Sequence, residues 1–381
     1  MALTKKDLVF GIMYIVFGKQ FHLWLCGKGV NVRFINHRPG DCKVLPDLQC
    51  GSEKISVTSN GLAFITNGFA DATNCNKDFL RGNLYLFDFN KPHHGAKRLQ
   101  MKNVSKEFLE NFDPHGMDVF EVNGVVKLYV VNHLDDFDAI EVFQYSSEHP
   151  TDVYHVSTIR NDLFNCLNDV TIIDEDEFYT TNFIKFCSRS KYHFLTFFEL
   201  AFGMNTANIV FYKKGFTAIA AHGSLFNGIA LSPDKKFLYS ASTSTSSISV
   251  FERYNIGQLK RVKKIEVGYF PDNIHIDREG HLYVGIGKDM FGFAQLTKNQ
   301  TDFVSASAVK VEIPGDYDWR NVKVKEILHD DGKDFVHVVS SAVFFNDQYL
   351  LGTVFHKLAY CKVWSSKLLH TATNSKKGLA P

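Results

Sequence analysis

The sequence predicts an all-β fold, a six-bladed β-propeller, and two observations carry this prediction. Alternating apolar segments are separated by Gly, Asn and Asp turns, with few amphipathic helical stretches along the 381 residues. One pattern also returns along the chain: a small or polar residue, a short strand, a turn, and a second strand of the type Leu-Tyr-Val or Phe-Tyr. The repeats are spaced by roughly 45 to 65 residues, as propeller blades are, and begin near Asn60, His115, Asn168, Asn227, Asn273 and Ser340.

The composition agrees with a soluble β-rich core. The formal net charge is +1 and hydrophobic residues make up 45% of the chain, so no bulk attraction to nucleic acid or anionic lipid is expected. Phenylalanine is abundant, with 35 residues, and together with Tyr and Val it favours strands over helices. In the repeat NGIALSPDKKFLYSASTSTSSISVFER we expect strands at 229–231, 237–241 and 248–251, joined by a Pro-Asp-Lys turn and a Ser/Thr connection.

One stretch, residues 188–215, breaks the repeat pattern. Phe194, Phe197, Phe198 and Phe202 follow helical spacing, which predicts an aromatic helix over 188–204. Such a helix could serve as a lid or as an anchor at a membrane surface. A helix that only packs on the propeller explains the spacing equally well.

Residues 1–27 indicate a secretory segment. Lys5 and Lys6 precede the apolar run LVFGIMYIVFG, and FHLWLCG follows after Lys19. We expect an uncleaved signal anchor that sends the body of the protein into the lumen, with a cleaved signal or a core helix as alternatives. The expected organisation is this segment, a propeller at 28–361 and a tail at 362–381, in the secretory pathway, membrane-anchored with a lumenal or extracellular propeller, or secreted.

The secretory expectation makes the seven cysteines candidates for oxidation. Two Asn-X-Ser/Thr triplets, at Asn103 and Asn299, are candidate glycosylation sites in the same compartment.

Oxygen-bearing side chains recur where the repeats begin. The innermost strand of each propeller blade runs along the central channel, so residues that start these strands meet at one mouth. A single Asn or Asp at such a place more often caps a turn, but recurrence at equivalent points favours a metal site. Carboxylate and amide oxygens without thiols suit a hard cation such as Ca²⁺. The residues concerned are Glu53, Asn168, Asp169, Asn227, Asp272 and Asn273.

Two histidines belong to the same mouth. His115 starts one repeat, and His133 ends the second strand of that repeat. A histidine alone is more often a hydrogen-bonded structural residue. Beside a metal, His115 is a candidate general base with His133 as its neighbour.

The motifs, taken together, resemble a known family. SNGLAFITNG, DPHGMDVF, LYVVNH, LNDVTIID, NGIALSPDKKFLY, DNIHID, LYVG and GTVFHKLAYC extend from about Cys42 to Cys361. As a set they are similar to the paraoxonase/arylesterase family, calcium-dependent lactonases with a six-bladed propeller. No G-x-S-x-G motif is present, which argues against an α/β-hydrolase.

The resemblance implies roles for individual residues. His115 is expected to be the general base that takes a proton from water, with His133 assisting it, and Cys42 is expected to form a disulfide with Cys361. A calcium ion is expected to polarise the lactone or ester carbonyl. Its implied ligands are Glu53, Asn168, Asn227, Asp272 and Asn273.

One departure from the family pattern concerns a second cation. The family usually follows the calcium-binding Glu with an Asp, which joins the residue equivalent to Asp169 and a backbone carbonyl around a structural calcium. This sequence has Lys54 at that place. We expect the Lys54 ammonium to replace the ion and to pair with Asp169 and the carbonyl of Met117. The alternative is that Lys54 points to solvent and the second site is broken.

A second departure concerns the pocket wall. Phe183, Ile184 and Gly287 stand where vertebrate members carry polar groups. This change puts broad arylesterase activity in doubt more than lactonase chemistry, because the implied metal ligands and His115 are retained.

Two functions remain open from the sequence. The first is a calcium-dependent hydrolase of lipophilic lactones or esters, anchored to the membrane, with the aromatic helix at the bilayer edge. The second is non-enzymatic, since membrane-anchored, paraoxonase-like proteins of nematodes assist assembly of ion channels and are similar in fold. Retained metal ligands do not separate these functions, because bound calcium also stabilises the fold.

Overall fold

The computed structural model describes residues 35–48, 51–68, 82–187, 190, 192–288, 304–333, 335–355 and 357–363. The predictions for residues 1–27, for the tail beyond 363, and for Cys26, Cys50, Cys75 and Asn299 lie outside the described residues. In the described part of the chain, no helix combines the length and the apolar character needed to cross a membrane.

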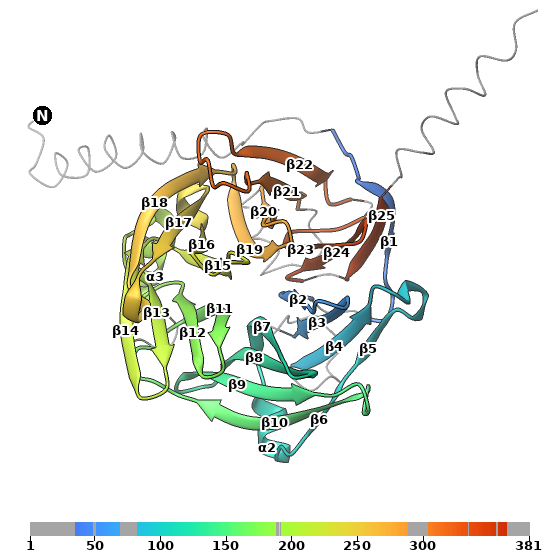
Figure 1. Cartoon of the computed structure of the whole chain (residues 1–381), viewed down its shortest axis with the longest axis horizontal. Helices are drawn as coiled ribbons and strands as arrows, with labels where there is room; N and C mark the ends of the chain where they lie inside the picture. The colour runs from blue at the N-terminus through green and yellow to red at the C-terminus, as the bar shows by residue number, and fades with distance from the viewer. Residues whose placement is uncertain are drawn as a thin grey trace, which may run out of the picture.

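Six sheets surround a central axis, which confirms the predicted six-bladed β-propeller (Figure 1). The strands of the first three blades, from the axis outwards, are β2 (Ile55–Val57), β3 (Leu62–Asn67), β4 (Asn83–Asp88) and β5 (Ala96–Arg98); β7 (Pro114–Val122), β8 (Val125–His133), β9 (Asp138–Tyr145) and β10 (Asp152–Ile159); β11 (Leu167–Asp174), β12 (Glu177–Asn182), β13 (Ala207–Lys213) and β14 (Phe216–Gly223). A short strand, β6 (Gln100–Lys102), pairs in parallel with β10 at the outer edge of the second blade.

The remaining blades follow the same antiparallel order. They consist of β15 (Phe226–Leu231), β16 (Phe237–Ser242), β17 (Ser247–Arg253) and β18 (Leu259–Glu266); β19 (Phe270–Ile276), β20 (Leu282–Gly287), β21 (Ala306–Glu312) and β22 (Lys323–Asp330); β23 (Val339–Phe345), β24 (Gln348–Thr353), β25 (Ala359–Val363) and β1 (Gly40–Val44). The described helices are α2 (Lys106–Asn111), α3 (Thr196–Phe202) and the single turns η1 (Pro92–His94), η2 (His193–Leu195), η3 (Thr243–Thr245) and η4 (Asn255–Gly257).

The second strand of the repeats explains the tyrosine in their pattern. Tyr129, Tyr179, Tyr239 and Tyr283 lie on β8, β12, β16 and β20, and each is at most 1% exposed. Each ring packs between its own blade and the next, as Tyr239 does against Leu282 and Val284. The core is therefore a set of apolar interfaces between adjacent sheets, to which the repeated tyrosine contributes a large buried surface.

The two ends of the described chain meet in the last blade. β1 pairs antiparallel with β25, with Cys42 directly opposite Cys361, and a disulfide joins these two residues. The disulfide implied by the family resemblance is thereby confirmed. β25 runs past Cys361 to Val363, so the sheet extends slightly beyond the boundary expected at 361.

The first repeat starts earlier than the sequence pattern predicted. Asn60 lies in the turn between β2 and β3, where its side chain accepts a hydrogen bond from Thr58 (2.6 Å). The innermost strand of this blade is β2, directly after Glu53 and Lys54. Turn-forming Ser-Asn-Gly at 59–61 resembles a repeat start because both contain Asn before an apolar strand.

The predicted aromatic helix is present as η2 and α3. Phe194, Phe197, Phe198 and Phe202 are between 44% and 68% exposed. The opposite face carries Glu199, which is fully buried and accepts hydrogen bonds from the backbone N–H groups of residues 185 and 186 (both 2.9 Å). The helix is thus fixed to the third blade through its polar face, and its aromatic side chains face outwards.

Replacing both Cys42 and Cys361 with Ser should lower the free energy of unfolding by about 5 kcal/mol, because the bridge spans 319 residues and restricts the unfolded chain. The matched control removes the bridge between Cys166 and Cys187, which spans 21 residues, for an expected loss of about 3 kcal/mol. Denaturant titration measures both. An equal or larger loss for the shorter bridge would contradict the expectation.

Candidate metal centre and active site

Irregular pairing shapes the axial ends of the inner strands. The register shifts in β7 between residues 114 and 117, in β11 between 167 and 170, in β15 between 226 and 229, and in β19 between 271 and 274. These shifts contain His115, Asn168, Asp169, Asn227, Asp272 and Asn273. A bulge turns side chains out of the regular alternation of a strand. Consecutive residues such as Asp272 and Asn273 can therefore both place their side chains near the central axis.

Glycine permits the inner strands to approach each other at this end. A Cβ atom on Gly116 would lie 2.2 Å from the backbone oxygen of Asn168, and one on Gly228 would lie 2.6 Å from the Cα of Asn273. Any side chain at these positions would push the neighbouring strands apart. In the His115-Gly116 and Asn227-Gly228 pairs, the first residue supplies a polar side chain and the glycine allows the neighbouring strand to approach closely.

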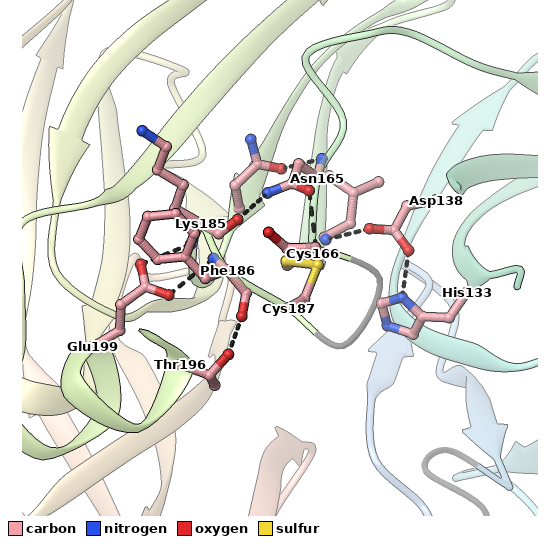
Figure 2. Close-up of a disulfide and its surroundings, with 12 residues drawn as sticks. His133, Asp138, Asn165, Cys166, Lys185, Phe186, Cys187, Thr196 and Glu199 are labelled. Atoms are coloured by element: carbon pink, nitrogen blue, oxygen red, sulfur yellow. Dashed lines mark hydrogen bonds and ion pairs between the residues drawn. A yellow bond between two sulfur atoms is a disulfide. The ribbon is translucent and has the colours of Figure 1, made fainter. Parts of the chain in front are cut away.

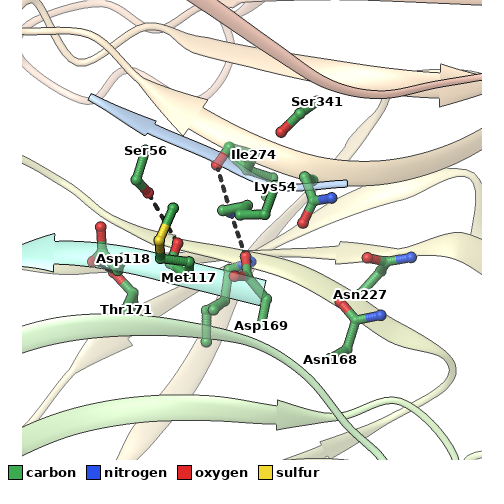
Figure 3. A network of polar contacts seen from close by, with 12 residues as sticks. Lys54, Ser56, Met117, Asp118, Asn168, Asp169, Thr171, Asn227, Ile274 and Ser341 are labelled. Carbon is green, nitrogen blue, oxygen red and sulfur yellow. Dashed lines mark hydrogen bonds and ion pairs between the residues drawn. The ribbon is translucent and has the colours of Figure 1, made fainter. Parts of the chain in front are cut away.

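Six oxygen atoms at this end of the axis are buried and have no hydrogen-bond partner among the described residues; Figure 3 shows three of the side chains, those of Asn168, Asp169 and Asn227. Buried polar atoms are rarely left without a partner, since desolvation of each costs roughly 1–3 kcal/mol. A cation held by oxygens of this group would supply the missing partner, and carboxylate and amide oxygens are the donors that Ca²⁺ prefers. They are Glu53 Oε2, Asn168 Oδ1, Asp169 Oδ1, Asn227 Oδ1, Asp272 Oδ1 and Asn273 Oδ1.

The amide nitrogens of the asparagines are directed away from these oxygens. Asn273 Nδ2 donates to the backbone oxygen (3.1 Å) and to Oε1 (3.0 Å) of Glu53, and Asn168 Nδ2 lies 3.5 Å from His115 Nε2. In the described residues, no three His, Cys, Asp or Glu side chains form a metal-binding group by themselves. The candidate centre therefore depends on the amide oxygens of Asn168, Asn227 and Asn273.

The electrostatics of the centre favour a cation. Burial raises the pKa of the Asp272 carboxyl well above its usual range, and the nearby Glu53 carboxylate raises it further. Two buried carboxylates that repel each other are stabilised in their ionised forms by a positive charge between them. The centre can thus bind a divalent ion whose charge these two residues balance.

Lys54 forms the next layer along the axis. Its ammonium is buried, lies 2.5 Å from Asp169 Oδ2 and donates to the backbone oxygen of Ile274 (3.4 Å) (Figure 3). The alternative that Lys54 points to solvent is wrong. The expected contact with the carbonyl of Met117 is also wrong: the ammonium donates to the carbonyl of Ile274 instead, and the Met117 oxygen accepts a hydrogen bond from the Ser56 hydroxyl (2.9 Å).

The two histidines are joined to each other beside the centre. His115 Nδ1 lies 3.0 Å from His133 Nε2, and His133 Nδ1 lies 2.7 Å from Oδ1 of Asp138. His115 Nε2 lies 3.6 Å from Glu53 Oε1. Asp138 was not predicted from the sequence, where it is the last of three aspartates in the loop HLDDFD and carries no distinguishing signal.

The expected pocket-wall residues lie at the same end of the propeller. Phe183 and Ile184 follow β12, whose last residue is opposite Leu167, and Gly287 ends β20 opposite Phe270. Phe183 and Ile184 pack with the disulfide between Cys166 and Cys187, a pairing that the sequence left open (Figure 2). The wall is therefore apolar and covalently tied to the strand that carries Asn168.

Asn103, the candidate glycosylation site within the described residues, is exposed between β6 and α2. Its glycosylation stays a prediction.

The fold and the convergent oxygens define a six-bladed β-propeller with a candidate cation centre and a histidine pair at one mouth. The family model described as arylesterase matches residues 34–363, and the chain belongs to this family. It is 28% identical to serum paraoxonase/lactonase 3 of Rattus norvegicus, covering 85% of this chain and 89% of the relative. Identity to serum paraoxonase/arylesterase 1 of Homo sapiens is also 28%, with the same coverage of both chains.

A solved structure of a luciferin-regenerating enzyme is similar in fold, with a TM-score of 0.51 at 12% identity, covering 84% of this chain and 94% of that one. At this identity the likeness concerns the fold alone.

Changing Lys54 to Met should lower the free energy of unfolding by roughly 3–5 kcal/mol, because the Asp169 carboxylate would stay buried without its ammonium partner. The matched control is Lys213→Met, which breaks an ion pair to Glu177 whose lysine is 61% exposed and should change the free energy of unfolding much less, because solvent screens an exposed pair. Denaturant titration without added metal checks both. Equal effects of the two substitutions would show that the buried pair has no special role.

Proposed function

We propose that this protein is a calcium-dependent hydrolase of lactones and esters. The observation that carries the proposal is the group of six buried, unpartnered oxygens beside a hydrogen-bonded histidine pair. Family membership supports ester or lactone hydrolysis, and relatives at 28% identity are named as lactonase and as arylesterase. The calcium ion and the roles of individual residues go beyond what family membership and the names of the relatives show.

The ligands we assign to the ion are Glu53 and Asp272 as carboxylates and Asn168, Asn227 and Asn273 as neutral carbonyl donors. Their charges sum to that of one divalent cation of opposite sign, and oxygen donors select Ca²⁺ or another hard ion over soft metals. When bound, such an ion supplies Lewis-acid polarisation of the substrate carbonyl and stabilisation of the oxyanion.

His115 is the group we assign as general base. Its Nε2 takes a proton from water as the water oxygen bonds to the carbonyl carbon, and the π electron pair of the C=O bond moves to the carbonyl oxygen. When that pair returns, the acyl C–O bond breaks and the leaving alkoxide takes the proton back from His115. The Glu53 carboxylate, 3.6 Å from Nε2, stabilises the positive imidazolium that results. His133 holds the other ring nitrogen of His115 in place.

The pocket wall favours apolar substrates. Phe183, Ile184 and Gly287 offer no charged group, so aliphatic lactones fit this mouth better than substrates that need polar contacts. The aromatic face of α3 is exposed beside the same blade. A membrane anchor in residues 1–27, a membrane or protein partner and a secretory compartment stay predictions; the two disulfides within the described residues support an oxidising compartment.

We expect hydrolysis of aliphatic lactones by the purified protein with calcium, loss of turnover with a chelator, and a drop in kcat of about 10² to 10⁴ for His115→Gln. His222→Gln, which changes a histidine on the outer strand β14, is the matched control and should leave kcat unchanged. Absence of turnover in folded, calcium-loaded protein would instead support the non-enzymatic role. In that case the calcium centre would serve the stability of the propeller.

We further propose a single calcium ion for each chain, because Lys54 already places a positive charge on Asp169. Elemental analysis of desalted protein should give about one calcium per chain, and Lys54→Asp, which exchanges the ammonium for a carboxylate, should raise the count towards two. Two calcium ions bound to the wild-type chain would contradict the proposal. Lys213→Asp is the control for a general effect of added negative charge.

A further inference from the structure

A tight hairpin places a buried carboxylate behind the histidine pair. β8 ends at His133 and β9 begins at Asp138, and the two residues are directly opposite each other in the register. The connecting loop is closed by a hydrogen bond from the backbone N–H of Leu134 to the carbonyl of Phe137 (3.0 Å). Asp138 is 1% exposed, so its carboxylate is held in one place by the end of the hairpin.

Both oxygens of Asp138 accept hydrogen bonds from different elements. Oδ1 lies 2.7 Å from His133 Nδ1, and Oδ2 accepts from the backbone N–H of Leu167 at 2.9 Å (Figure 2). An ionised carboxylate can only accept. The hydrogen of the neutral His133 ring is therefore on Nδ1, which makes Nε2 of that ring an acceptor.

This assignment fixes the direction of the next hydrogen bond. Because His133 Nε2 accepts, the partner 3.0 Å away, His115 Nδ1, must donate. The Nε2 atom of His115 then carries a lone pair, and Asn168 Nδ2 at 3.5 Å is oriented as a donor towards it. Asn168 therefore supports the assignment independently of Asp138: its amide nitrogen can only donate, and it faces the His115 nitrogen that the assignment makes an acceptor. Its Oδ1 is one of the six buried oxygens.

Asp138 also connects the histidines to the strand of the candidate centre. Leu167, which donates to Asp138, immediately precedes Asn168, and the residue before it, Cys166, forms the disulfide to Cys187 (Figure 2). The carbonyl of Cys166 accepts from the backbone N–H of Phe183 (2.9 Å). The Asp138 carboxylate thus fixes the histidine pair relative to β11, the strand that carries Asn168.

We infer that Asp138 is a positioning residue that sets the tautomers of His133 and His115, so that His115 Nε2 faces the centre as an acceptor. The inference rests on the proposed hydrolase function. Asp138 contacts the His133 ring and the backbone of Leu167, and it acts through His133. The relay has the logic of an Asp-His pair that orients a base, extended by a second imidazole.

Asp138→Asn tests the inference with almost no change in shape. The amide keeps one acceptor and gains an NH₂ donor, and this donor cannot face the N–H of Leu167. It must therefore face His133 Nδ1, which then becomes an acceptor with the ring hydrogen on Nε2. The hydrogen bond to His115 reverses, His115 Nε2 carries the hydrogen, and the base is blocked.

We expect Asp138→Asn to lower kcat for a lactone by roughly 10² to 10⁴ with KM changed less than about threefold. The matched control is Glu141→Gln on the same strand. Glu141 is equally buried and accepts from another imidazole, that of His155 (2.8 Å), outside the pair, so its loss of charge should leave kcat within about threefold. Thermal melting of both variants separates folding from turnover.

A double-mutant cycle distinguishes positioning from a structural role. If Asp138 acts through His133, adding Asp138→Asn to the His133→Gln variant should lower kcat only slightly further. Equal, additive losses, or a normal kcat for Asp138→Asn in an active enzyme, would overturn the inference.

Nitrogen NMR of the imidazoles supplies a readout that needs no turnover. In ¹⁵N-histidine-labelled protein, assigned with His133→Gln, we expect a protonated Nδ1 on His133 in the wild type and a protonated Nε2 in Asp138→Asn. If the wild type hydrolyses no lactone, but the protonated nitrogen of His133 changes from Nδ1 to Nε2 in Asp138→Asn, the proposed function is contradicted and the inference is retained. A protonated His133 Nε2 in the wild type would overturn the inference alone.

Discussion

Closure of the ring is the constraint on which the candidate centre depends. β1 is the first described strand, and it completes the sheet formed by the last three strands, β23 to β25. Glu53 is then held by the last blade, since its carbonyl accepts a hydrogen bond from the Ser340 hydroxyl (2.9 Å) on β23. If β1 left β25, the blade that supports Glu53 would lose its outer strand, and the first candidate ligand along the chain would lose part of its support. The disulfide of Cys42 to Cys361 ties this long-range pairing together.

The polar centre exists at the expense of local hydrogen bonding. The register shifts in β11, β15 and β19 break the regular ladder and bring five of the six oxygens to the axis without a partner. Desolvation of six such oxygens costs several kcal/mol in total, and the apolar interfaces between blades must offset it. The repeated tyrosine, which packs between blades, belongs to that compensation. Rigidity and function are therefore separated within each repeat: the second strand packs, and the start of the first strand presents the polar group.

Much of this organisation was predictable because it repeats. Asn168, Asn227 and Asn273 recur at equivalent points, and repetition identifies both the blades and the mouth. Glu53 precedes a three-residue strand and was placed at the mouth only by its position before the first repeat; the repeat pattern itself chose Asn60, which is a turn residue. Contacts that depend on how strands of different segments align could not be predicted from the local sequence around either partner. The backbone partner of Lys54 and the pairing of Cys166 with Cys187 are of this kind, as is the selection of Asp138 from three aspartates.

The charges along the axis lead to one further conclusion about the centre. Glu53, Asp272 and Asp169 place three carboxylates at its mouth, and the Lys54 ammonium pairs with one of them. Asp118, further along, accepts from the N–H groups of Ile172 and Val119 and from the Thr171 hydroxyl, although burial raises its pKa to about 6. In their ionised forms Glu53 and Asp272 therefore place two negative charges at the mouth without a protein cation. A monovalent ion would leave half of this charge uncompensated in a buried site, and a second divalent ion would exceed it. Charge balance alone thus favours one divalent cation beside Lys54.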